Sequence, residues 1–501
     1  MRVFTVTLAM LMLATGNADG ADFELRARTA LQATGQHNAV DPLLSFLPPE
    51  LATSLLSAQS GNYDTHYLLA WLQVRGALTL ADRVSIVGTI DSTAITWEYF
   101  AGSTGDAEFT SSQTPLFDGL SGAEALEKAA FVREFYLESV LGSRQQFLVS
   151  AGKRRTRLLG GFFYDDYGLD ASLAWDFWSH EDLVAQFKAY AILPYRYLPE
   201  TDSDLLIAGG ELRLKDMLFE SVAIGGFYLR DRSGAIHSLL RQGHATDLLA
   251  AQQVPEGLNI YLSDSPGTPP ADLGTVWLEL RLDLSVAILH SLVALQVGSG
   301  QFPEQGQQRG SDAPLPPGEA AWQQQPPVSR RVEFQGHLAL LEAVFPVARG
   351  FSITPFVLSV SGVDHQQASQ ERRFTAFLSL IPYVQGYATI FLTGGFGELY
   401  TGRNIELIGM GTGGLAAVGT AMRADLGSRF SCGLSAALLG QNRPDQGFFG
   451  GHYGTEFDSH ASLALSAGFS ARAELNLLVP GNYFPAESVM VVGTAGVRGE
   501  F

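Results

Sequence analysis

The sequence predicts an all-β fold: a transmembrane, antiparallel, up-and-down β-barrel of about 18 strands, with about 16–20 as the range, short periplasmic turns and long external loops. Three observations predict this fold. Apolar and polar residues alternate over long stretches, and the connections between those stretches alternate in length. An export signal also precedes a chain that has no other apolar run long enough for a membrane-spanning helix.

The alternation is clearest in residues 274–284. One parity there reads Gly, Val, Leu, Leu, Leu, Leu and the other reads Thr, Trp, Glu, Arg, Asp. A period of two indicates a β-strand with one apolar and one polar face. The strands run to about 10–13 residues, whereas ~9–11 tilted residues cross a bilayer and soluble strands average ~5–6. A membrane barrel therefore explains the pattern better than a β-sandwich, and a last strand that ends in Phe501 suits the closing strand of a barrel.

The connections follow the asymmetry of outer-membrane barrels, in which periplasmic turns are short and external loops are long. Short turns are expected near 81–83, 141–146, 178–182, 215–217, 285, 344–349, 425–427 and 466–468, with long segments at 34–65, 98–130, 231–273, 299–330 and 362–403. The expected strands lie near 22–33, 66–80, 84–97, 131–140, 147–158, 168–177, 183–194, 205–214, 218–230, 274–284, 286–298, 331–343, 350–361, 404–424, 428–439, 452–465, 469–478 and 488–501. Residues 371–393 are expected to form a folded external loop.

Composition narrows the class of protein further. The 501 residues carry 32 Lys and Arg against 51 Asp and Glu, a formal charge of −19, so a nucleic-acid partner is not expected. The single cysteine, Cys432, excludes an internal disulfide and a Cys-based zinc site. Residues 1–20 have the features of a signal peptide, and 21–501 are expected to form one barrel domain in the bacterial cell outer membrane, crossing it many times.

Several segments resemble the alginate-export family of outer-membrane porins. They are 132–158 (VREFYLESVLGSRQQFLVSAGKRRTRL) with the following GGFFYDDYGLDASLAWDF, then 361–364 with 374–382 and Asn404, and finally 453–458 with 479–484 and Phe501. These motifs spread over residues 130–501, and their order carries the resemblance.

The resemblance implies a monomeric barrel that passes an anionic exopolysaccharide outward through an arginine-lined constriction. It places Arg133 at a pore arginine, Lys153 and Arg155 at a Gly-Arg-x-Arg pair, Asp165 at a lumen-side acid and Arg472 at the first of two arginines on the penultimate strand. Two positions depart from the family pattern, because Glu474 replaces the second arginine and Tyr167 replaces a loop asparagine. Those departures bear on whether the polymer is alginate itself.

The residues also support a charged lumen without the family. Lys153, Arg155 and Arg157 share one strand face, and turning them toward lipid would cost ~2–4 kcal/mol each at mid-depth. Arginine binds carboxylates in a bidentate manner and keeps its charge, which suits a uronate. The candidate pore-lining residues are Arg26, Arg133, Lys153, Arg155, Arg157, Asp165, Arg281, Arg331, Arg472 and Glu474. The alternative is that these arginines only balance inward acids.

Two functions remain open at this point: an exporter of an anionic, alginate-like exopolysaccharide, and a passive porin for small anionic solutes. The expected partners are that polymer or small anions, outer-membrane lipid and a separate periplasmic scaffold protein. Neither a catalytic site nor a cofactor or metal site is expected. The glycine-rich run at 409–414 matches a dinucleotide fingerprint, but it lacks the strand-turn-helix context that such a site needs.

Overall fold

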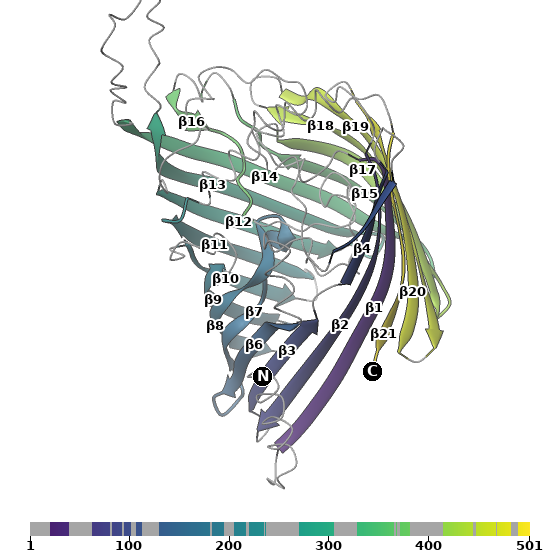
Figure 1. The fold of residues 1–501 in the computed structure, drawn as a ribbon. Coiled ribbons are helices and arrows are strands. Elements are labelled where there is room, and N and C mark those ends of the chain that lie inside the picture. The colour runs from purple at the N-terminus through teal and green to yellow at the C-terminus, as the bar shows by residue number, and fades with distance from the viewer. Residues whose placement is uncertain are drawn as a thin grey trace, which may run out of the picture.

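The computed structural model describes residues 21–39, 63–80, 83–92, 95–101, 107–112, 130–180, 183–194, 205–216, 220–234, 236, 270–304, 328–364, 367, 371–380, 414–443, 447–466, 468–481 and 489–501. Nearly all of them are in β-strands (Figure 1). No helix in this part of the chain has the length and apolar character needed to cross a membrane.

The strands, in chain order, are β1 Ala21–Ala39, β2 Tyr63–Leu80, β3 Val84–Ser92, β4 Ile95–Ala101, β5 Ala107–Ser112, β6 Ala130–Leu141, β7 Phe147–Leu158, β8 Tyr164–His180, β9 Leu183–Pro194, β10 Leu205–Asp216, β11 Ser221–Asp231, β12 Ala271–Asp283, β13 Ile288–Glu304, β14 Val328–Ala348, β15 Phe351–Val360, β16 Arg373–Phe374, β17 Leu415–Leu426, β18 Phe430–Arg443, β19 Gly447–Ser466, β20 Phe469–Pro480 and β21 Met490–Glu500. A short 3₁₀ turn, η2, spans Leu159–Gly161.

The sheet closes on itself, because β1 pairs with β2 on one side and with β21 on the other, both antiparallel. Within the described chain, 18 strands form the closed up-and-down barrel, so the predicted fold is confirmed. The β4–β5 hairpin pairs with the far end of β2, and the short β16 pairs with β14 in parallel. Of the strand predicted at 404–424, residues 404–413 lie outside the described residues, and β17 begins at Leu415.

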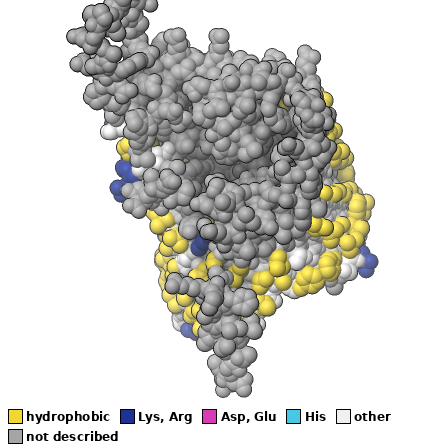
Figure 2. Space-filling model, viewed as in Figure 1, with side chains coloured by type: hydrophobic (Ala, Val, Ile, Leu, Met, Phe, Trp, Pro, Cys, Tyr) yellow, Lys and Arg dark blue, Asp and Glu magenta, His cyan; other side chains and the backbone are white. Residues whose placement is uncertain are grey.

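The outer surface of the barrel is apolar. On β12, Val276 and Leu278 are 59% and 48% exposed, while Trp277 between them is only 6% exposed. Figure 2 shows hydrophobic side chains over the visible outside of the wall. A wall with apolar side chains exposed at every second position is stable when it faces the hydrocarbon of a bilayer. A closed sheet also leaves no unpaired strand edge within that hydrocarbon. The chain is therefore a multi-pass barrel of the bacterial outer membrane.

The C-terminal residue takes part in closing the barrel. Phe501 and Ala27 exchange two backbone hydrogen bonds, of 2.8 and 2.9 Å. The Phe501 ring meets the Phe469 ring edge-on, with centroids 5.0 Å apart. This ring pair lies where β20, β21 and β1 meet, at the end of the barrel that carries the short turns, so the terminal aromatic residue contributes to the last pairing step.

Part of the lumen wall is apolar, and other segments of the chain pack against it. Buried apolar residues from β9 to β21 form one cluster with two segments that fold inward, the tip of the β7–β8 hairpin and residues 361–364 with 371–380. In that second segment Phe374, Phe377 and Leu380 are buried. The described residues 371–380 of the loop predicted at 371–393 insert no strand between β15 and β17 of the wall, as expected for a loop, but they fold into the lumen and not outward, because the apolar lumen face of β13–β15 offers them a surface to bury against.

Trp277 is central to this inner packing. Its ring lies 5.7 Å from that of Phe227, and a Cβ atom on Gly225 would lie 2.2 Å from it, so the indole packs on bare backbone. We expect Trp277→Ala to lower the free energy of unfolding by ~3–5 kcal/mol because it leaves a cavity. Urea unfolding of the barrel in lipid vesicles, followed by far-UV circular dichroism, measures the change.

The neighbouring residue provides the control for that prediction. Val276 lies on the same strand but faces lipid. Val276→Ala removes apolar surface that hydrocarbon covers in the folded barrel, and it opens no cavity in the lumen. An equal loss of stability in the two variants would contradict the inner packing role of Trp277.

Candidate solute pathway

The β7–β8 hairpin leaves the barrel wall partway along its length. β6 pairs with β7 only up to Lys153, and β8 pairs with β9 only from Gly168 onward. Between these points β7 and β8 pair only with each other. The departure occurs beside Gly152, whose φ is +139° and whose Cβ, if it had one, would lie 2.3 Å from the Phe135 carbonyl oxygen. Glycine thus permits the close approach at which the hairpin turns inward.

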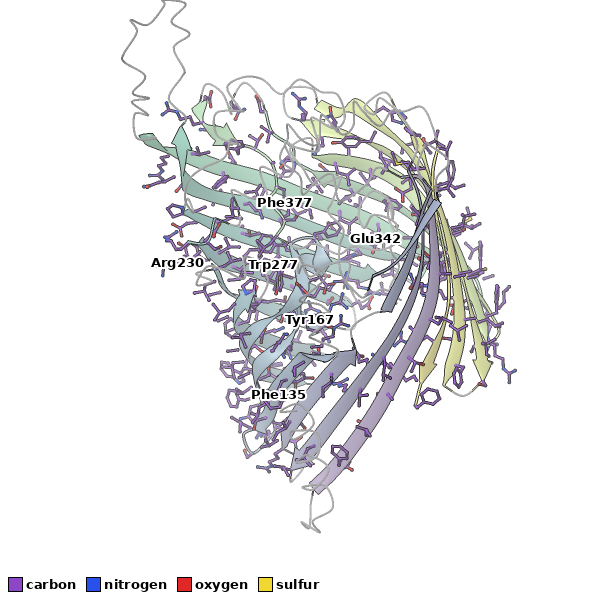
Figure 3. The ribbon with its side chains drawn as sticks, viewed as in Figure 1. Phe135, Tyr167, Arg230, Trp277, Glu342 and Phe377 are labelled. Carbon is purple, nitrogen blue, oxygen red and sulfur yellow. The ribbon has the colours of Figure 1, made fainter. Side chains whose placement is uncertain are left out.

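The tip of the hairpin is fixed inside the barrel. The Ser379 hydroxyl donates to the Phe162 carbonyl oxygen at 2.6 Å, and the Leu380 amide donates to that of Phe163 at 2.9 Å. The Phe163 ring lies 4.4 Å from Phe227 of β11. Figure 3 shows Tyr167, on the same hairpin, within the outline of the barrel. The hairpin therefore narrows the lumen as a held element of the fold.

A β-bulge on β6 places two charged residues next to each other on the lumen side. The register shifts between Thr89 and Ile90 of β3, so that Val132 lies opposite Ile90 and Glu134 lies opposite Thr89. Val132 and Phe135 are exposed on the outside, and Arg133 and Glu134 lie between them. The Thr89 hydroxyl donates to Glu134 at 3.0 Å. A bulge of this kind re-aims side chains that simple alternation would separate.

Arg133 and the hairpin meet at an aromatic ring. The Arg133 guanidinium carbon lies 5.0 Å from the centre of the Tyr167 ring, a cation–π geometry, and Arg133 is only 6% exposed. Tyr167 is the residue opposite Arg155 in the hairpin. Tyr167 is therefore a contact between the wall and the hairpin.

The hairpin carries its own cluster of charges. Arg155 Nε lies 2.6 Å from Asp165 Oδ1, and Arg157 Nε lies 3.6 Å from Asp165 Oδ2. Arg157 also donates to the Gly160 carbonyl oxygen. Asp165 is buried, whereas the side chains of Arg155 and Arg157 are 38% and 56% exposed. Two arginines thus share one carboxylate. Tyr167, which lies opposite Arg155 and under the Arg133 guanidinium group, brings Arg133 close to Arg155, Arg157 and Asp165, all of which were predicted site residues.

Other predicted residues lie on the lumen face away from the hairpin. Arg26 pairs with Glu24 at 2.5 Å, Arg281 with Glu220 at 2.7 Å and Arg472 with Glu474 at 2.5 Å. They are spread over β1, β12 and β20, so the structure does not gather them into one site with Arg133.

Two predicted residues are not on the lumen face. Lys153 lies opposite Phe135 and Leu169, which are exposed on the outer wall, and its amine donates to the Val132 carbonyl oxygen at 2.8 Å. Arg331 has the parity opposite to the inward residues Val332 and Phe334. The expected face was wrong for Lys153 because the hairpin bends immediately after it, and for Arg331 because its strand continues beyond the apolar band.

Several other charged residues on the lumen face were not among the predicted site residues. Arg154 pairs with Asp170 at 2.7 Å, Arg213 approaches Glu211 and Glu279, and His290 lies between Glu279 and Glu342 at 3.1 and 2.9 Å. These residues run along the wall from β7 to β14. The signal that could have found them is the register across neighbouring strands, since His290 lies directly opposite Glu342 on one side and Arg281 on the other, with Glu279 two residues before Arg281 on the same face of β12.

Arg75 of β2 was also missed. It lies opposite Arg26, and its Nη2 donates to the Tyr136 hydroxyl at 3.3 Å. Among the described residues Arg75 forms no ion pair, and its side chain lies on the lumen face of β2. No group of three or more His, Cys, Asp or Glu residues in the described ranges is arranged to hold a metal ion.

Three solved structures are similar to this chain along most of its length. OccK5 (OpdH) of Pseudomonas aeruginosa is 8% identical with a TM-score of 0.44, and 95% of this chain and 98% of that one are covered. OccAB4 of Acinetobacter baumannii is 9% identical with a TM-score of 0.46 over 95% and 98%. OccK2 (OpdF) of Pseudomonas aeruginosa, in complex with glucuronate, is 11% identical with a TM-score of 0.43 over 96% of each chain.

At these TM-scores the likeness assigns neither a family nor a substrate. No family model matches the chain, and no curated protein matches it. The resemblance to the alginate-export family therefore has no support from a family match, and the function is argued from the geometry of the lumen.

Proposed function

We propose that this barrel is a passive porin for small anionic solutes, above all carboxylates, and not an enzyme. The observation that carries the proposal is the cationic face of the inward hairpin. Arg155 and Arg157 both pair with Asp165 from the exposed side of the hairpin, and the Arg133 guanidinium group lies over the Tyr167 ring beside them. Local positive charge at a narrow part of a pore raises the concentration of anions there and excludes cations.

The strength of these contacts suits passage. Arg155 and Arg157 are both more than one-third exposed, so their attraction to Asp165 is screened by water and is worth ~0–1 kcal/mol. A solute carboxylate can then replace Asp165 on one guanidinium group and leave again without a large barrier. Arg75, held by the Tyr136 hydroxyl, offers a further cation on the lumen wall.

The size of the solute follows from the packing inside the barrel. The hairpin tip and residues 361–364 with 371–380 fill part of the lumen with buried apolar side chains, and hydrogen bonds from Ser379 and Leu380 hold the two segments together. A held constriction favours small solutes. An anionic exopolysaccharide is the competing solute, and no described contact favours a polymer over a single carboxylate.

Uptake into liposomes separates the two solutes. Vesicles that contain the purified barrel are expected to admit a small carboxylate faster than a neutral sugar of similar size, and to exclude a polyuronate. Arg155→Gln combined with Arg157→Gln should remove most of the preference for the carboxylate. Arg144→Gln combined with Arg429→Gln, which removes the same charge from two short turns, should leave the preference intact. Entry of the polyuronate, or equal rates for carboxylate and sugar, would contradict the proposal.

A further inference from the structure

One arginine of β11 faces away from the lumen. Phe227 and Leu229 are buried toward the inside, whereas Ile224 and Tyr228 are exposed on the outside, and Arg230 has the parity of the exposed pair. Figure 3 shows Arg230 beyond the edge of the sheet, away from the barrel interior. An outward charge on a barrel wall is costly at mid-depth, so its height along the strand decides what it meets.

The height of Arg230 corresponds to the far edge of the apolar band. β11 starts at Ser221, close to a short turn, and Arg230 follows nine residues later. At ~3.3 Å per residue and a tilt of ~40°, those residues rise ~23 Å, close to the ~25 Å of the apolar band. Below Arg230 the outer wall carries Ile224 and Val276, and Tyr228 lies at the level of an aromatic girdle. Arg230 thus lies at the headgroups of the outer leaflet.

The surroundings of Arg230 leave its charge available. Asp272, its neighbour across the strand pair, accepts a 2.6 Å hydrogen bond from the Tyr228 hydroxyl and pairs with Arg232 at 3.2 Å. Arg232 is held further by the carbonyl oxygens of Asp231 and Ala271. The acid is therefore already compensated. With the residues that the structure describes, Arg230 makes neither a hydrogen bond nor an ion pair.

We infer that Arg230, with Arg232 and Tyr228 beside it, forms a binding site on the outer wall for a phosphate group of an outer-leaflet glycolipid. A guanidinium group binds phosphate in a planar, bidentate manner, and a tyrosine ring packs against the lipid next to it. The apolar residues Ile224 and Val276 directly below provide a surface for acyl chains, so the site takes the phosphate of a lipid and not the free ion. This inference does not depend on the solute that the lumen carries.

Native mass spectrometry of the full-length barrel in detergent tests the site. The probes are lipid A with its phosphates, the same lipid with the phosphates removed, and inorganic phosphate. Wild type is expected to retain phosphorylated lipid A. Arg230→Gln should weaken that binding about tenfold, as for one lost charge-assisted hydrogen bond. Arg230→Lys, which keeps the charge, should bind more tightly than Arg230→Gln.

A matched variant and the other probes decide the outcome. Arg144→Gln removes an exposed arginine from the short turn between β6 and β7, at the opposite end of the barrel, and should bind lipid A like wild type. Equal binding by wild type and Arg230→Gln would overturn the inference. So would equal retention of the lipid without phosphates, or displacement of lipid A by inorganic phosphate at the same concentration.

Discussion

Replacing Arg75 and Arg157 together by glutamate is expected to convert an anion-selective pore into a cation-selective one. Each replacement changes the lumen charge by two units. Arg75 forms no ion pair with a described residue, and Arg157 makes only the longer of the two ion pairs to Asp165, at 3.6 Å. The Arg155–Asp165 pair at 2.6 Å stays in place, so the hairpin keeps its main ionic contact. Charge at a constriction acts on every passing ion, which makes the expected effect large.

The reversal potential of single channels in a potassium chloride gradient measures this change. Its sign should invert in the double variant and stay as in wild type in Arg144→Glu combined with Arg429→Glu, where the same charge is placed in two short turns. If both double variants shift the potential equally, net charge and not the lumen site sets the selectivity. A wild-type pore without anion preference would also contradict the proposed function.

The closed barrel could be predicted from the sequence because each strand obeys a local rule. Val276 and Leu278 alternate with Trp277 and Glu279, and a bilayer on one side requires that alternation in strand after strand. The alternation of short and long connections predicted which end of the barrel faces the periplasm. Connection lengths can be read from the sequence without knowledge of any tertiary contact. The strand that ends in Phe501 pairs with β1, as its apolar parity indicated.

The pathway was harder to predict because it depends on exceptions to alternation. The bulge puts Arg133 and Glu134 on one side, and the bend after Lys153 separates it from Arg155 although both have the same parity. The inward position of Phe374 and Phe377 depends on packing against distant strands, which no local pattern encodes. Arg154 and Asp170 have the parity opposite to that of Lys153 and Arg155, so the predicted lumen face left them out.

Removing the inward hairpin is expected to raise the conductance several-fold. The designed change replaces residues 156–166 by Asn-Gly, which joins Arg155 to Tyr167, two residues that already lie opposite each other. Asn-Gly favours the tight turn that a two-residue hairpin needs. The part of β7 that pairs with β6 is untouched, so the wall should still close. Without Phe162, Phe163 and Tyr164 the narrowest part widens, and ions and solutes pass with less restriction.

A graded variant tests whether the position of the tip, and not merely its presence, sets the conductance. Ser379→Ala removes the donor to the Phe162 carbonyl oxygen but leaves the Leu380–Phe163 hydrogen bond and the Phe163–Phe227 contact. It should give channels that switch between the wild-type level and a higher one, because the tip is held by fewer contacts. Single-channel recordings that show the same steady conductance in wild type, Ser379→Ala and the shortened hairpin would place the constriction elsewhere in the barrel. In that case the arginines of the hairpin could not be the residues that select the solute.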